Sequence, residues 1–459
     1  MKKILALVLA MLMVLSLAAC GADPDNDEKE TLDNTQSQVD LDETVGEEDG
    51  DALDSDPDSE SDEQETEEIY DAPLKNQITY LPLDGIVKLT FTNIAAPENV
   101  EVQDMSVLQD GSVLMWIEED PELDMALHMF VTTADGGPIY APQNNWDFFH
   151  GQEQVEILEL DNLDTSYAID MSRMFANFAS LQELDVSGLD ISKATNMHGL
   201  FSGCSSLQSI HTDGWDTSKV KDMSEMFMDC VSLKTLDLSN IVTTSVETMQ
   251  SMFYGCSELQ TLNLSSFDTA KVSDMMMMFD GCSSLTELDV SGFNTSNVVT
   301  MSGMFSSCRQ LQQLDVSGFN TSKVTDMSWM LSGCEQIGYV DVSAWDTANV
   351  QDMNGMFAMC YMLQQLDVSG FNTSRVTDLS DMFSQCYVLE SLDVSNFDTA
   401  NVEKMDGMFT GCKALTTLDV SGWSTAKVTN MDLIFQWTTL SDLDLSGWAI
   451  PEGAQLGID

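Results

Sequence analysis

The sequence predicts an α/β solenoid, in which one short strand and one short helix recur in every coil, preceded by a small β-rich capping domain. The first observation is a strict period: nine cysteines, from Cys204 to Cys412, lie 26 residues apart. The second is that apolar residues recur at fixed places between them. A fixed period of this length is typical of stacked units, none of which can bury its apolar face alone.

Each repeat is numbered from its cysteine, which is position 1. Positions 4, 7 and 9 are Leu, Ile or Val in most repeats, so segments such as "LDVS" alternate apolar and polar residues and predict one strand. Asn294 and Thr295, at positions 13 and 14, are typical of a helix N-cap. Val at position 17, Met at positions 20 and 23 and Phe at position 24 then predict a short α or 3₁₀ helix on the other side of the core.

The chain divides into five predicted parts. Residues 1–20 are a lipoprotein signal peptide, 21–71 an acidic tether and 72–151 the β-rich cap domain, where "GSVLMWIEE" and "LHMFVTT" alternate apolar and polar residues. Residues 152–437 hold eleven repeats of 26 residues. Residues 438–459 form a shortened terminal repeat and a C-terminal cap, since terminal repeats of a solenoid are atypical.

The first twenty residues have a basic start, an apolar run and small residues before Cys20. This order is that of a secretory signal peptide, and the apolar run is too short for a lasting membrane span. "LAAC" resembles a bacterial lipobox, which implies cleavage before Cys20 and a lipid on its sulfur. We therefore expect an exported protein anchored to the bacterial cell surface; the alternative is an ordinary signal peptide in which Cys20 is incidental.

Acidity dominates the chain. The net charge is −60, and residues 23–71 hold 23 acids and one base, Lys29. Such a segment cannot bury enough apolar surface to fold, so we expect a solvated tether, or alternatively an acidic binding tail. The overall charge repels phosphates and anionic headgroups, which argues against nucleic acid as a partner.

The repeats resemble a known family. "LDVSGFNTSNV", "MSGMF" and the cysteine period are similar to the BspA-like leucine-rich-repeat surface proteins of bacteria, which include a lipoprotein repeat of unknown function from mycoplasmas. "DGGPIYAPQ" and "WDFFHG" look like the lead-in segment of that family, so the resemblance covers residues 104–448. It implies a surface-exposed solenoid, with several members associated with adhesion to host or matrix proteins, and it does not imply a shared ligand.

The cysteines and methionines are interpreted as core. Nine is an odd number for disulfide pairing, and no two cysteines of the repeats lie close enough in sequence for a zinc motif. We expect buried free thiols, and methionines at positions 20 and 23 that face the leucines.

Position 8 carries Asp in most repeats, so these side chains should stack on the exposed face of the strands. Like charges on adjacent strands repel each other. Hydrogen bonds from the serines at position 10, screening by salt, or bound Ca²⁺ could offset this repulsion, and one Asp per repeat offers few ligands for Ca²⁺. Position 6 varies beside these acids, so the candidate binding face comprises Glu287, Asp289, Gln313, Asp315, Tyr339, Asp341, Gln365 and Asp367.

Signals for an enzyme are missing from the sequence: the four histidines are scattered, and neither a phosphate-binding loop nor a nucleophile elbow occurs. We therefore expect a lipid-anchored protein-binding or adhesion module without catalysis or cofactor, whose partners are host, matrix or neighbouring-cell proteins. The alternative is a surface-coat or spacer protein with no specific ligand. An enzyme within residues 72–151 is a third possibility.

Overall fold

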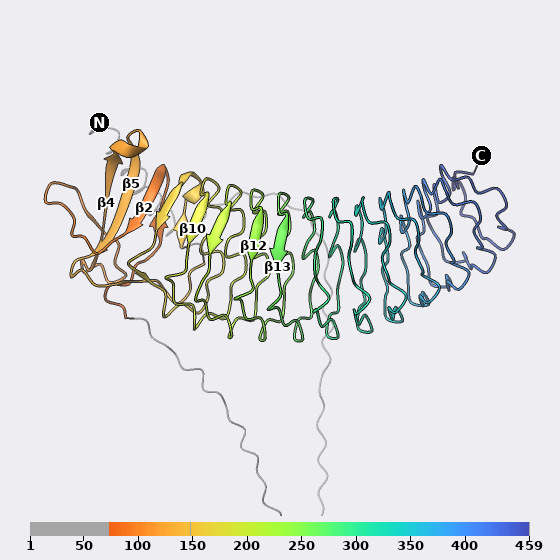
Figure 1. The fold of residues 1–459 in the computed structure, drawn as a ribbon, viewed down its shortest axis with the longest axis horizontal. Coiled ribbons are helices and arrows are strands. Elements are labelled where there is room, and N and C mark those ends of the chain that lie inside the picture. The colour runs from red at the N-terminus through yellow and green to blue at the C-terminus, as the bar shows by residue number, and fades with distance from the viewer. Residues whose placement is uncertain (1–72, 147, 459) are drawn as a thin grey trace, which may run out of the picture. The chain divides into compact units, whose positions relative to one another are not determined.

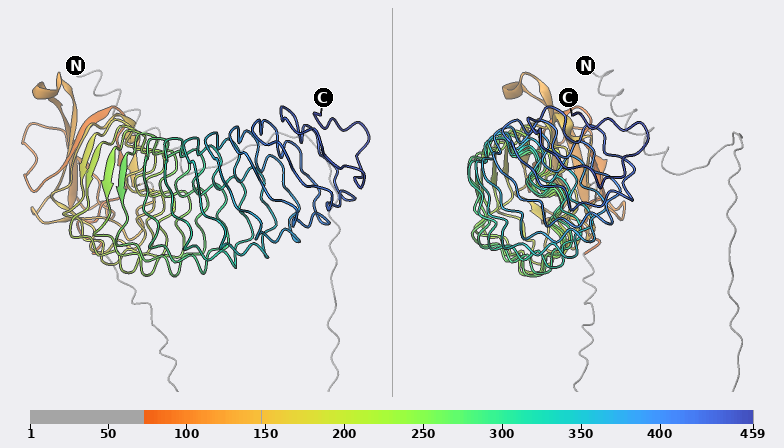
Figure 2. Two further views of the ribbon diagram at one scale, coloured as in Figure 1. Left: turned by 45° about the vertical axis from the view of Figure 1, so that its right-hand side comes forward. Right: turned by 90° about the vertical axis from the view of Figure 1, so that its right-hand side faces the viewer.

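The structure is a computed structural model that describes residues 73–146 and 148–458. The predicted signal peptide, Cys20 and the predicted tether lie outside the described residues, so their interpretation stays a prediction. Within the described residues, no helix is both long and apolar enough to cross a membrane. The described residues belong to one compact unit, in which the repeats follow one another as successive coils (Figures 1 and 2).

A five-stranded sheet opens the molecule, with the strand order β3-β4-β5-β2-β8. The strands β4 and β5 form an antiparallel hairpin around the 3₁₀ turn η1, and β2 lies parallel to both β5 and β8. Because β8 already belongs to the first repeat, the sheet crosses the expected boundary at residue 151 and continues into the repeats. The elements up to β9 are β1 (Leu81–Pro82), β2 (Ile86–Phe91), β3 (Gln103–Asp104), β4 (Val113–Asp120), η1 (Pro121–Leu123), β5 (Ala126–Thr133), β6 (Ile139–Tyr140), β7 (Phe149–His150), η2 (Gln152–Gln154), β8 (Ile157–Glu159) and β9 (Leu163–Asp164).

The expected short strand lies at positions 6 to 8 in the repeats up to residue 263, is reduced to single bridges at position 6 from residue 287 to residue 365, and has no counterpart at residues 391–393 and 417–419. Parallel pairs β10–β11 and β12–β13 join neighbouring repeats, and β10, β12 and β13 are labelled in Figure 1. Further along, single parallel bridges join Glu287 to Gln313 and Tyr339 to Gln365. These strands are β10 (Glu183–Asp185), β11 (Ser209–His211), β12 (Thr235–Asp237) and β13 (Thr261–Asn263). We call the exposed side of these strands and bridges the strand face.

A second set of bridges, which was not anticipated from the sequence, runs along position 19. Parallel bridges connect each coil to the next from Asn144 to Asn430, through residues such as Asp326 and Asp352. At position 19 each coil is therefore paired with both of its neighbours, whereas the strand pairs and bridges at positions 6 to 8 join the coils two by two.

The expected helix in each repeat was wrong. Positions 21 to 26 of the described repeats form consecutive turns, with neither an α-helix nor a 3₁₀-helix among them. The amides of Met301, Gly303 and Phe305 donate to carbonyls of the next coil at 2.8 to 3.0 Å. An α-helix needs such amides for carbonyls four residues earlier in the same segment.

Backbone conformation gives the second reason. Positions 22 and 26 have positive φ throughout the repeats, including non-glycine residues such as Trp329 and Ser307, both at φ 57°. Two left-handed residues four positions apart would interrupt a right-handed helix in this segment. The Asn-Thr pair also starts a turn instead of capping a helix, because Asn294 Oδ1 accepts from the Ser296 amide at 3.1 Å and the Val298 amide donates to the Thr295 carbonyl at 3.0 Å.

The core confirms the interpretation of the cysteines and methionines. All nine cysteines of the repeats are free and buried, and the methionines at positions 20 and 23 that the sequence placed in the core are buried as well. Each thiol donates to a carbonyl of the preceding coil, as Cys308 does to Phe279 at 3.2 Å. Burial raises the pKa of the Cys204 thiol to about 12. The phenyl rings at position 24 stack from coil to coil, with centroids 5.6 Å apart between Phe279 and Phe305.

The C-terminal tail takes the place of a further coil. The amides of Leu433 and Phe435 donate to the carbonyls of Gln455 and Leu456 at 2.6 and 2.9 Å. Gly457 follows with φ +75°, and a Cβ there would lie 2.7 Å from the Gln436 Cα. Glycine is therefore required for this close approach.

Candidate functional site

The structure gathers the eight predicted face residues on the strand face. They alternate with buried residues of position 7, such as Leu288, Leu314 and Leu366, because successive side chains of a strand point to opposite sides. Asp341 is half-buried and the other seven are exposed. The bridges of the strand place Glu287 beside Gln313 and Tyr339 beside Gln365.

Each aspartate at position 8 of these strands is held by the serine two residues later. Asp315 Oδ1 accepts from the Ser317 amide at 3.1 Å and from its hydroxyl at 2.7 Å, and the same pair of bonds recurs at Asp289, Asp341 and Asp367. The serine hydroxyl is the main reason that the pKa of the Asp315 carboxyl lies below its ordinary value, although neighbouring Asp289 acts in the opposite direction. The same kind of bond lowers the pKa of Asp289 and Asp367, and the paired bonds hold all four carboxylates in a fixed orientation.

The Ca²⁺ alternative gains no support from this arrangement. Among the described residues, no group of three or more His, Cys, Asp or Glu side chains is placed to hold a metal ion. The serine hydrogen bonds provide the compensation for repulsion that the sequence left open.

A hollow opens in the middle of the strand face. Its volume is about 590 Å³, and it lies where position 5 is Gly338 instead of the glutamine found at Gln312 and Gln364. Tyr339 stands beside it with 58 % of its surface exposed. A neighbouring hollow of about 340 Å³ shares Gln313, Leu314 and Asp315 with it, so both together cover six of the eight predicted residues.

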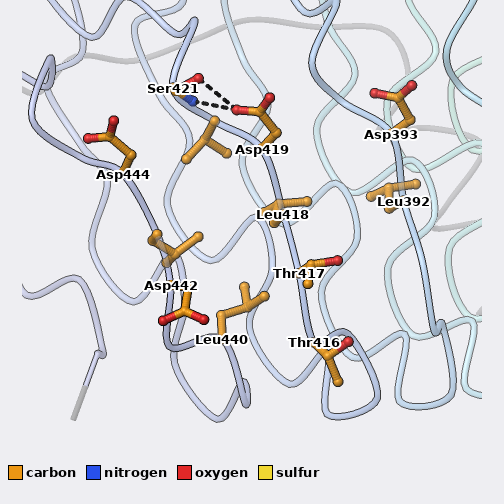
Figure 3. A pocket seen from close by; sticks show the side chains of 12 residues that line it. Leu392, Asp393, Thr416, Thr417, Leu418, Asp419, Ser421, Leu440, Asp442 and Asp444 are labelled. Carbon is orange, nitrogen blue, oxygen red and sulfur yellow. Dashed lines mark hydrogen bonds between the residues drawn. The ribbon is translucent and has the colours of Figure 1, made fainter.

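A further hollow lies at the C-terminal end of the same row, where sequence reasoning placed no site. It measures about 520 Å³, and Figure 3 shows Asp393, Asp419 and Asp444 side by side along it, with Ser421 bonded to Asp419. The apolar side chains Leu440 and Leu418 line it as well. Because the last repeat is one residue short, no regular spacing in the sequence indicated this hollow.

Sequence reasoning also missed the N-terminal end of the strand face. On the five-stranded sheet the rings of Trp116 and Phe130 stack at 4.9 Å, and those of Phe130 and His128 at 3.7 Å. His128 Nε2 lies 2.8 Å from the Thr90 hydroxyl, which donates to Glu159 at 2.7 Å. Burial is the main reason that the pKa of His128 lies below its ordinary value, and Lys88 adds to the effect.

Glu159 connects this cluster to the repeats, because it occupies position 8 of the first repeat. The alternation in "VLMWIEE" and "LHMFVTT" could have placed these side chains on one face. The insertion of β2 between β5 and β8, which brings Glu159 to this cluster, left no signal in the sequence.

Comparison with known protein families identifies a family for the repeats. A family model described as "Mycoplasma protein of unknown function, DUF285" matches residues 144–262, 247–366 and 337–448. The chain belongs to this family. The match confirms the resemblance inferred from the repeats, and no curated protein matches the chain.

Several solved structures are similar at low identity. A leucine-rich-repeat protein of Leptospira interrogans is 15 % identical, with 66 % of this chain and 71 % of that chain covered and a TM-score of 0.21. The functional domain of InlJ from Listeria monocytogenes, described as including a cysteine ladder, is 15 % identical over 62 % of this chain and 64 % of that chain, with a TM-score of 0.16. The TLR13–ssRNA13 complex is 15 % identical over 64 % and 44 %, with a TM-score of 0.23.

Proposed function

We propose that this chain is a lipid-anchored protein of the bacterial cell surface that binds other proteins through its strand face, without catalysis. The proposal rests on the contrast between constant and variable positions of the strand face. Position 8 repeats Asp and position 10 repeats Ser, while position 6 changes from Glu287 to Gln313, Tyr339 and Gln365. A rigid scaffold that presents differing side chains at fixed spacing is suited to recognition of a macromolecule.

The centre of the proposed interface is the hollow beside Tyr339. Exposed tyrosine provides a large contact area at a low cost in conformational entropy, and such residues are enriched where binding energy concentrates. The apolar floor of Leu314 and the polar rim of Gln313 and Asp341 fit an interface with a buried centre and a wet edge. Adhesion to host, matrix or neighbouring-cell proteins is the role that this chemistry supports best.

The test is a screen of the full chain, displayed on cells, against an array of host, matrix and bacterial surface proteins at low and physiological salt. We expect at least one partner whose binding persists at physiological salt, where mere charge attraction between surfaces is largely screened. Tyr339→Ala should weaken that binding about tenfold or more, as expected for the loss of a central aromatic contact. Trp329→Ala removes a partly exposed aromatic outside the strand face and should change it less than about twofold.

Absence of any salt-resistant partner would favour the coat or spacer alternative. An equal effect of the two variants would instead show that the strand face is not the contact surface.

The anchor has its own test. Cys20→Ala should abolish incorporation of labelled fatty acid and release the chain from the membrane fraction. An unchanged membrane association would contradict the lipid anchor and leave protein binding untouched.

A further inference from the structure

Six of the twelve basic residues in residues 152–437 occupy position 16 of their repeat. The first of them, Lys193, lies one coil before Lys219, and its Nζ lies 4.5 Å from the ring centroid of Tyr167. The other five, Lys219, Lys271, Lys323, Arg375 and Lys427, follow one another at intervals of 52 residues, or every second coil. We call these five residues the cation row. They lie in the turn that follows the strand, and all five are exposed.

The turn that carries the cation row is locked from coil to coil. Thr295, at position 14, is 1 % exposed, and its hydroxyl accepts from the Asn320 amide at 2.8 Å and donates to the Asn320 carbonyl at 3.0 Å. Stacked coils are spaced like neighbouring strands, so cations two coils apart lie about 10 Å from each other.

Asparagines at position 16 of the intervening coils hold the last three cations. Lys323 Nζ donates to Asn297 Oδ1 at 2.6 Å, and Asn297 Nδ2 donates to the Ala270 carbonyl at 2.7 Å. The same relay joins Arg375 to Asn349 at 3.0 Å and Lys427 to Asn401 at 2.6 Å. These side chains are therefore directed along the row instead of moving freely in solvent, which lowers the entropic cost of binding a ligand.

The surroundings of the cation row differ in charge from the rest of the chain. Positions 13 to 18 of ten successive repeats contain seven acids and seven bases, whereas the whole chain carries −60. In the four central segments, from 294–299 to 372–377, Asp346 is the one acid and two bases are present. The other side chains there are mainly Asn, Gln, Ser and Thr, which hydrogen-bond hydroxyl groups.

We propose that the cation row binds a linear acidic polysaccharide that carries a single carboxylate or sulfate on each disaccharide. Such a chain repeats its anion at every second sugar, as the cation row repeats its cation at every second coil. Double-stranded nucleic acid, with a charge every 1.7 Å or so, is far too dense for this spacing. A folded protein without internal repeats has no reason to place a carboxylate at equal intervals over five sites, whereas a polysaccharide does so by construction.

Salt gives this binding a distinctive profile. In roughly 10 mM salt the screening length is about 30 Å, so a polyanion experiences the repulsion of the whole acidic chain. In roughly 150 mM salt the length falls to about 8 Å, and the cation row dominates its own neighbourhood. Affinity should therefore rise from low to physiological salt and fall again near 1 M, unlike ordinary attraction between a basic protein and a polyanion.

The experiment measures binding of the full chain to a hyaluronan decasaccharide, which carries five carboxylates, at these three salt concentrations. The variant Lys271→Gln, Lys323→Gln, Arg375→Gln removes three cations of the row and should weaken binding about tenfold. The control variant Lys234→Gln, Arg309→Gln, Lys413→Gln removes the same charge elsewhere and should change affinity less than twofold or so. Asn349→Ala keeps every charge but frees Arg375, so a loss of roughly two- to fourfold is expected.

Two further probes define specificity. A carboxyl-reduced decasaccharide should fail to bind, and a polygalacturonate oligomer of equal length, with an anion on each sugar, should bind no better than hyaluronan. Equal losses in both triple variants, or affinity that is highest at the lowest salt, would overturn the proposal. An absence of sugar binding would overturn it as well. A row variant that changes only the self-association of the chain, measured by sedimentation, would also count against the proposal.

Discussion

Thr295 provides the sharpest test of how the coils are joined. Its buried hydroxyl makes two bonds to Asn320 of the next coil, one as acceptor and one as donor. Thr295→Val preserves the shape of the side chain but leaves an amide and a carbonyl without this partner. An unpaired buried polar group costs about 1–3 kcal/mol, and Asn320 is partly open to water, so we expect a loss of about 2–4 kcal/mol.

The matched variant is Thr295→Ser, which keeps the hydroxyl and removes one methyl group. Its expected cost is about 1 kcal/mol. Urea unfolding measures the loss of stability, and hydrogen exchange measures protection of the Asn320 amide, which should fall in the Val variant and persist in the Ser variant. Exposed Thr286→Val should stay within about 0.5 kcal/mol of the unsubstituted chain. If Val were tolerated as well as Ser, the hydroxyl bonds would not be what locks this turn.

Three further predictions concern the thiols, the tail and the acids. A thiol reagent should find few fast-reacting cysteines in the native repeats and nine after denaturation without reductant, and a lower count without reductant would indicate disulfides. Raising the pH from 7 to 9 should barely increase the reaction rate of the native thiols, because burial raises the pKa of the Cys256 and Cys360 thiols to about 12. Gly457→Ala should release the tail and expose the Leu433 and Phe435 amides to hydrogen exchange, since the added Cβ would meet the Gln436 backbone; unchanged exchange would refute the capping role. Ser317→Ala should raise the pKa of Asp315 in an NMR titration. Because folding lowers the pKa of the Asp315 carboxyl, its stabilising effect is present above the ordinary pKa of about 3.9 and is lost as the pH falls through the lower pKa of the folded state. The variant should therefore lose less stability on acidification than the unsubstituted chain.

The strand and the core could be predicted because apolar periodicity reports burial directly. Leu288 and Val290 alternate with Asp289, and Cys308 recurs with a fixed environment, so each position has one physical role in every repeat. The strand face followed from the same alternation.

The segment with methionine could not be predicted from periodicity, because spacings of three and one fit a turn as well as a helix. The deciding feature is the positive φ of Trp329 at position 22 and Ser307 at position 26, because the side chains of these two residues do not indicate it. Other coils have glycine at the same two positions, as Gly303 and Gly333, and these glycines could have indicated the left-handed backbone. The bridges at position 19 escaped notice because Asp326, Thr300 and Lys404 share no chemistry, and the bridges themselves join backbone atoms. A side-chain hydrogen bond from Lys404 to Asp378, at 3.0 Å, accompanies one of these bridges.

The clusters at the two ends of the strand face were missed for another reason. His128, Thr90 and Glu159 meet because β2 inserts between β5 and β8, an order that local sequence does not specify. The C-terminal hollow forms where the last repeat, which is one residue short, departs from the regular stacking of the coils, and the spacing in the sequence does not specify that departure.

The most direct test of the stacked coils is the position of the sulfur atoms. In a crystal of the full chain, an anomalous difference map should show the nine cysteine sulfurs of the repeats in a single row, with neighbours about 4.8 Å apart. Sulfurs scattered among separate globules, or paired within bonding distance, would contradict the stacking on which the strand face and the cation row both depend.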